Sequence, residues 1–208
     1  MRRQKVIQDK VHNQCPIQSQ YGGCIPEVLQ GYERLLNDMI KTIPQVAVSH
    51  LEITWPDGYD YTHANEVVGC CLSALRKSLQ YQKIVSCYGW VREVAEGRLD
   101  GKPHFHIGFF TNAHELQSGF TIAQRLNELF TKQFELPSTS IYVRCIYPNI
   151  DCQRGLNLNC PSAIKLRVNA PNAEEQRLNI LNWLSYHAKV ETKGNTPSVR
   201  EFAFSKVK

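Results

Sequence analysis

Two histidines stand two positions apart in the segment from Lys102 to Phe110, whose apolar and aromatic residues predict a β-strand. Side chains alternate between the faces of a strand, so His104 and His106 point the same way, about 7 Å apart. Two imidazoles at this spacing can hold one divalent ion, provided that a third ligand joins them. The alternative is a polar strand face that only meets water.

The preceding segment offers that third ligand. Residues Ile84–Val94 are rich in β-branched and aromatic types, and the glycine-containing stretch Ala95–Gly101 predicts a hairpin loop between two strands. A turn centred in this loop places Glu93 opposite His104, about 5 Å away on the same face. A slipped register would bring Glu96 there instead. Two histidines and one carboxylate, with open positions, suit metal-assisted chemistry on an oxygen-rich substrate.

A second reactive pair lies near the end of the chain. Asn172 to about Val190 predicts a helix, and Tyr186 and Lys189 stand three positions apart on its less apolar side. A lysine ammonium favours ionisation of a nearby phenol and can neutralise a substrate phosphate. The tyrosine is then a candidate nucleophile. The alternative is a tyrosine that packs with its hydroxyl at the surface. The remaining histidines have no comparable setting, and we expect them to be surface or hydrogen-bonded side chains: His50, His63, His114 and His187.

The rest of the chain must build a scaffold for these residues. Periodicity and turn residues predict an α+β fold in which helices pack on a central antiparallel sheet of about five strands. We expect residues 1–43 to form an irregular tail (1–24) and one helix, and residues 44–208 to form the domain. The predicted helices are Pro26–Thr42, Thr62–Gln80, Thr121–Phe134 and Asn172–Val190, and the further strands are Val46–Trp55, Ile141–Tyr147 and Ala163–Val168.

Composition excludes several classes of protein. The 208 residues are 42% hydrophobic and 21% charged, which is a folding composition. No apolar run approaches the ~20 residues of a membrane-spanning helix, and the polar N-terminus predicts no secretory signal. The eight cysteines include no C-x-x-C pair, so we expect reduced, mostly buried thiols in a cytoplasmic protein. A net charge of +5 permits a polyanionic partner without requiring one.

The two reactive segments together resemble the HUH endonuclease superfamily, in which a His-hydrophobic-His strand precedes a Tyr-x-x-Lys helix. The stretches YGWVREVAEGRLDGKPHFHIGFF and WLSYHAKVETKG look like the inovirus-type (filamentous phage) replication initiators, which also occur in prophages and other mobile elements. The similarity covers roughly residues 44–204. It implies an HUH endonuclease fold, related to ferredoxin-like and RRM-like folds.

The resemblance also implies a mechanism. His104, His106 and Glu93 would bind Mg²⁺ or Mn²⁺ at the scissile phosphate of single-stranded or hairpin origin DNA. Tyr186 would form a 5′-phosphotyrosine and leave a 3′-OH that primes rolling-circle replication, and Lys189 would hold the phosphate. No phosphate-binding glycine-rich loop is present, so a separately encoded helicase and polymerase in the bacterial host cell would be required.

Basic residues near both segments are candidate DNA contacts. Arg92, Arg98 and Lys102 flank the hairpin, Lys193 follows the tyrosine helix, and Tyr88 and Trp90 are aromatic residues that could stack on bases. They can equally be solvated charges and core aromatics. Two other functions remain open: a non-catalytic DNA-binding regulator with the same fold, and a metalloenzyme that acts on a small molecule.

Overall fold

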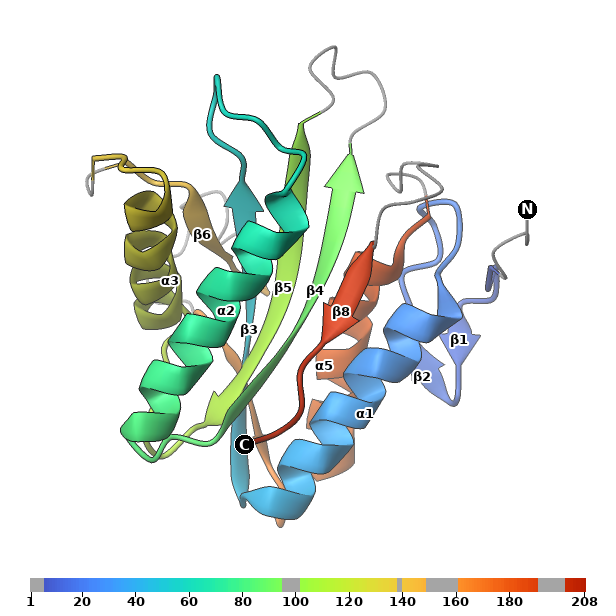
Figure 1. Cartoon of the computed structure of the whole chain (residues 1–208). Coiled ribbons are helices and arrows are strands. Elements are labelled where there is room, and N and C mark those ends of the chain that lie inside the picture. The colour runs from blue at the N-terminus through green and yellow to red at the C-terminus, as the bar shows by residue number, and fades with distance from the viewer. Residues whose placement is uncertain (1–5, 95–101, 138–139, 149–160, 191–200) are drawn as a thin grey trace.

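A computed structural model describes residues 6–94, 102–137, 140–148, 161–190 and 201–208 (Figure 1). It confirms the α+β fold: helices pack on an antiparallel sheet of six strands, one more than expected. The strand order is β6-β3-β5-β4-β8, and β7 pairs with β3 as well. The strands are β3 (Gln45–Thr54), β4 (Ser86–Val94), β5 (Pro103–Asn112), β6 (Val143–Ile146), β7 (Ile164–Arg167) and β8 (Phe202–Phe204).

Apolar residues cover both faces of this sheet. Helices α2 (Ala64–Tyr81) and α3 (Gly119–Gln133) pack against one face, where Phe105 and Ile107 are fully buried. Helices α1 (Pro26–Thr42) and α5 (Ala173–Ser185) pack against the other, which also carries Val46 and Val48 of β3. His104 and His106 share this second face by strand alternation, toward one end of the strands. Among the described residues, no helix combines the length and apolar character needed to cross a bilayer.

Helix boundaries lie within two residues of the expected ones, apart from the end of α5. Helix α1 begins and ends where expected, with Pro26 in its first turn. Helix α2 begins at Ala64, because the hydroxyl of Thr62 donates to Asp60 instead of capping the helix. Helix α3 begins two residues before the expected Thr121, because Ser118 accepts a hydrogen bond from the Thr121 backbone at 3.3 Å.

Residues 6–24, the described part of the expected tail, are not irregular, and with Ile25 they form part of the fold. They include a small hairpin, β1 (Val11–His12) and β2 (Cys15–Pro16), and they bury Ile17, Cys24 and Ile25 in the core beside α1 and α5. The last strand, β8, was also not predicted. It is partly exposed, and its three residues are too few for a sequence pattern to predict a strand or its pairing with β4.

Two glycines make room for one tyrosine on the site-bearing face. Gly89 and Gly108 are paired across β4 and β5. A Cβ atom at Gly108 would lie 2.5 Å from the ring of Tyr32, and one at Gly89 would lie 2.9 Å from it. The glycines therefore let Tyr32 of α1 lie against the strands, where its hydroxyl donates to the Gly89 carbonyl at 3.2 Å.

Some expectations lie outside the described residues. These are the hairpin loop 95–101, most of the loop between β6 and β7, and the side chains of Glu96, Arg98, Lys193, Cys152 and Cys160. Six cysteines do lie within the described part of the chain, all as free thiols, and Cys70 is the exposed one among them.

Candidate metal centre

The hairpin register brings Glu93 opposite His104, which confirms the predicted pairing. Oε2 of Glu93 lies 3.2 Å from Nε2 of His104 and 3.3 Å from Nε2 of His106. One ligand atom from each of the three residues falls within 4.8 Å of the other two. These residues could therefore hold a metal ion, as the sequence spacing predicted.

The chemistry of this set suits a divalent cation. Glu93 is fully buried and His106 is 3% exposed, whereas the His104 side chain keeps 18% of its surface in contact with solvent. Burial lowers the pKa of His106, although the Glu93 carboxylate acts in the opposite direction. A neutral imidazole has a lone pair for a metal, and a buried carboxylate gains from a cation beside it. The residues fit an ion bound by two nitrogens and one oxygen.

Tyr186 lies after the end of α5, not within a helix that continues to Val190. The helix ends at Ser185 and tightens into the 3₁₀ turn η1 (Tyr186–Ala188). The chain then becomes extended, because it pairs with the N-terminal segment: Ile25 donates to the carbonyl of Ala188 at 2.8 Å, and Val190 donates to that of Gly23 at 3.0 Å. The expected helical end was wrong for this reason.

Lys189 nonetheless lies against both Tyr186 and the metal ligands. Its ammonium is 3.8 Å from the centre of the Tyr186 ring and 3.2 Å from Oε2 of Glu93. Burial of the ammonium favours its neutral form, but Glu93 and Tyr186 together outweigh burial and raise the pKa of Lys189 above its usual value. Lys189 is therefore a buried cation that joins the tyrosine to the carboxylate.

Tyr186 borders a cavity of about 390 Å³ beside these ligands. Its ring centre is 5.5 Å from that of His106 and 5.5 Å from that of Tyr21, which comes from the N-terminal segment. The cavity has several aromatic rings and one arginine, and its lining is Gln18, Tyr21, His50, Glu52, His106, Arg144, Ile146, Tyr147, Pro148, Trp183 and Tyr186. Arg144 pairs with Glu52 at 2.8 Å.

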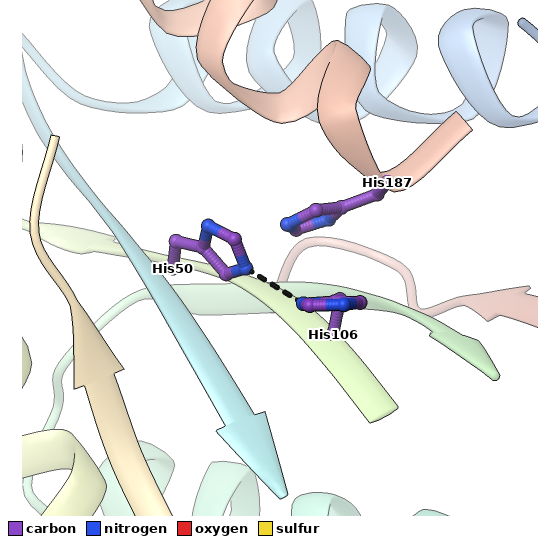
Figure 2. Close-up of side chains that lie close together, drawn as sticks. All are labelled: His50, His106 and His187. Carbon is purple, nitrogen blue, oxygen red and sulfur yellow. Dashed lines mark hydrogen bonds between the residues drawn. The ribbon is translucent and has the colours of Figure 1, made fainter. Parts of the chain in front are cut away.

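Two further histidines belong to this region and were not singled out in the sequence. His50 and His187 are 2% and 0% exposed, and each is hydrogen-bonded, so of the two expected settings, surface or hydrogen-bonded, the second is the one found. Nε2 of His50 lies 3.0 Å from Nδ1 of His106, and the ring centres of His50 and His187 are 4.1 Å apart (Figure 2). Burial, and then the neighbouring His106, hold the pKa of His50 well below its usual range. The one feature of the sequence that could have pointed to either histidine is that His187 directly follows Tyr186.

The two predicted DNA contacts within the described residues, Arg92 and Lys102, do not line this cavity. Arg92 shares one face of β4 with Tyr88 and Trp90, and this face is opposite to the one that carries the metal ligands. Both aromatic rings are buried there against the α2 and α3 layer. Lys102 pairs with Asp57 in the turn after β3. Neither basic residue lines the cavity, and the two aromatic rings are core residues.

Comparison of the chain with known protein families, with curated proteins and with solved structures found no match.

Proposed function

We propose that this protein is a metal-dependent endonuclease and strand transferase for single-stranded DNA, with Tyr186 as its nucleophile. The proposal rests on one observation: Lys189 contacts both the carboxylate of the candidate metal set and the ring of the tyrosine. Tyr186 and one of the metal ligands, His106, line the same cavity, and Lys189 lies against both Tyr186 and Glu93. The resemblance to inovirus-type HUH initiators points to the same residues and gives the reaction class.

The reaction exchanges one phosphodiester for another. The phenolic oxygen of Tyr186 forms a bond to phosphorus while the bond from phosphorus to the 3′ oxygen breaks. The phenol loses its proton to water, and the departing 3′ oxygen gains one, so the step needs no oxidant or reductant. Reversal, with the 3′ hydroxyl attacking the phosphotyrosine, rejoins the strand. Lys189 holds the phosphate through its charge.

A divalent ion at Glu93, His104 and His106 supplies electrostatic stabilisation of phosphate charge when it is bound. We propose Mg²⁺ or Mn²⁺, because a carboxylate oxygen and open positions for water suit these ions. Lys189 lies 3.2 Å from Oε2 of Glu93, and with an ion held by this carboxylate the ammonium would be available to the incoming phosphate.

The aromatic lining of the cavity supports a nucleic acid substrate. Tyr21, Tyr147 and Trp183 present ring surfaces near Tyr186, and unpaired bases stack on such rings with about 1–3 kcal/mol each. A single strand can enter a concave site of this kind more readily than a duplex, whose bases are already stacked. We therefore propose single-stranded or hairpin DNA as the substrate, within rolling-circle replication of a mobile element.

The test uses a pool of random 40-nucleotide single strands, fluorescent at the 3′ end, with Mn²⁺. A 5′-phosphotyrosine retains the 3′ portion, so wild-type protein should carry the label through a denaturing gel, whereas 5′-labelled DNA should leave it unlabelled. Tyr186→Phe should abolish the adduct. Tyr21→Phe is the matched control, because it removes a hydroxyl from the neighbouring ring alone and should still form the adduct. Equal labelling of Tyr186→Phe and wild type would overturn the proposal.

One observation favours a second function, a DNA-binding regulator without catalysis. The Glu93–Lys189 pair already neutralises the carboxylate without a metal ion. A regulator would bind the same DNA pool, shift it on a native gel at unchanged affinity in EDTA, and form no adduct with any divalent ion.

A further inference from the structure

The geometry points to a second metal site, in which His50, His106 and His187 bind a borderline divalent transition ion such as Zn²⁺ through three imidazole nitrogens. The three residues come from β3, β5 and the turn η1, and all are buried. This site contains no carboxylate and is distinct from the Glu93 set. The site requires no nuclease activity, so its test is independent of the test of the proposed function.

The three rings lie close enough together for an adjustment of the side chains to reach the spacing that zinc requires. One nitrogen from each residue lies within 4.8 Å of the others, and the His50 and His106 nitrogens are 3.0 Å apart. Figure 2 shows the three rings gathered between the sheet and the end of α5. In a tetrahedral site with Zn–N distances of about 2.0–2.1 Å, ligand nitrogens are roughly 3.3 Å apart. A small rotation of the rings therefore replaces one hydrogen bond by an ion.

Partners that orient two of the ligands are also in place. Metal-binding histidines usually hold their second ring nitrogen on a protein oxygen. The Tyr32 hydroxyl lies 2.6 Å from Nδ1 of His187, which leaves Nε2 as the atom to face the ion. The Glu93 carboxylate lies 3.3 Å from Nε2 of His106, which directs Nδ1 toward His50. These contacts set the rings before any ion arrives.

His50 completes the set through its freedom to change tautomer. Its Nδ1 is buried and makes no hydrogen bond to any described part of the chain. No protein oxygen therefore locks the proton on one nitrogen, and Nε2 can present its lone pair to an ion. His50 and His106 both line the 390 Å³ cavity, which provides the ion with a route from solvent and a place for a fourth ligand such as water.

The two metal sites compete for one residue. A neutral imidazole has a single lone pair, so His106 serves either the Glu93 set through Nε2 or the three-histidine set through Nδ1. Three imidazoles favour Zn²⁺, whereas a site with a carboxylate and water suits Mg²⁺ and Mn²⁺. We therefore expect Zn²⁺ to displace Mn²⁺ without occupying the same position.

The test measures binding to metal-free, full-length protein without DNA. Zn²⁺ is titrated against a fluorescent zinc indicator, and Mn²⁺ is followed by electron paramagnetic resonance. His187→Gln should weaken Zn²⁺ binding at least about tenfold and leave Mn²⁺ binding unchanged. His104→Gln should do the reverse, and His106→Gln should weaken both. The exposed His63 provides the control variant His63→Gln, which should change neither.

Tyr32→Phe is a second, milder variant, and it keeps the test decisive if His187→Gln does not fold. It keeps the ring and removes only the hydroxyl that orients His187, and it should weaken Zn²⁺ binding by about 10–100-fold. Circular dichroism and thermal unfolding check that each variant is folded. Three results would overturn the site: no saturable Zn²⁺ binding, unchanged Zn²⁺ binding in both His187→Gln and Tyr32→Phe, or loss of Zn²⁺ in His104→Gln equal to that in His187→Gln.

Discussion

Lys189 and Glu93 form an ion pair across 3.2 Å in the interior, with side chains 7% and 0% exposed. Glu93 belongs to the sheet, whereas Lys189 directly follows the turn that holds Tyr186. The carboxylate oxygen in this pair is also the oxygen that lies nearest to His104 and His106. A divalent ion at this set would therefore meet the same oxygen as the ammonium does, and Lys189 places a cation there without any metal.

Lys189→Met should make the stability of the protein strongly dependent on metal. Removal of one partner from a buried ion pair leaves an uncompensated charge and costs about 3–5 kcal/mol. Mn²⁺ can replace the lost positive charge, so it should raise the unfolding free energy of the variant more than that of wild type. Urea unfolding with and without Mn²⁺ measures both values. Equal stabilisation of the two proteins by Mn²⁺ would show that the ion and Lys189 do not share the carboxylate.

Glu93→Gln combined with Lys189→Met should be more stable than either single variant. Each single change leaves one buried charge alone, whereas the double change removes both. We expect a coupling energy of roughly 1–3 kcal/mol in a double-mutant cycle, measured by urea unfolding in EDTA. The same cycle with Glu52 and Arg144, an ion pair whose arginine is 63% exposed, is the matched comparison and should give less than about 1 kcal/mol.

Gly108→Ala should destabilise the protein and disturb Tyr32. The new Cβ would lie 2.5 Å from the Tyr32 ring and 3.1 Å from Leu184, and overpacking of this kind typically costs about 1–3 kcal/mol. Gly69→Ala is the matched control, since a Cβ there meets nothing within 4 Å and the residue lies inside α2. It should leave stability unchanged or raise it by up to ~1 kcal/mol. Thermal unfolding distinguishes the two, and equal melting temperatures would contradict the close packing at Gly108.

Adjacent thiols on α2 should differ sharply in reactivity. Cys70 is exposed, whereas burial raises the pKa of Cys71 to about 11 and that of Cys145 to about 12. Alkylation requires the thiolate, so iodoacetamide at pH 8 should modify Cys70 first and reach the other two only after unfolding. Fragment-resolved mass spectrometry follows each site over time. Comparable rates for Cys70 and Cys71 in the native protein would contradict the burial of this helix face.

The local part of the site could be predicted from the sequence, because a hairpin fixes its own register. Glu93 and His104 are separated by a short loop, and strand alternation determines which side chains share a face. His50 could not be placed in this way, since its position depends on β3 lying next to β5, although 48 residues (55–102) separate the two strands in the chain. No local sequence pattern predicts that these two strands are neighbours.

The contact between Lys189 and Tyr186 was expected from helical spacing, yet it arises differently. The chain leaves the helix at this point, because backbone groups of residues 23–25 pair with residues 188–190. Periodicity favours a longer helix, whereas long-range hydrogen bonding and the burial of Ile25 decide the outcome. The burial of Tyr88 and Trp90 likewise follows from the second helical layer, which the sequence of β4 alone does not reveal.

The pairing of residues 23–25 with residues 188–190 also means that the turn bearing Tyr186 depends on the opposite end of the polypeptide. During synthesis on a ribosome, strands β3 to β7 can form before residue 186 has emerged. The turn, however, cannot be fixed until it docks on a segment made about 165 residues earlier, since Ile25 pairs with Ala188 and Gly23 with Val190. A shortened protein that begins at residue 44 would retain His104, His106 and Glu93, yet it would lack Tyr21, Tyr32 and the backbone partners of this turn. The metal ligands and the contacts that hold the tyrosine turn thus come from different parts of the chain.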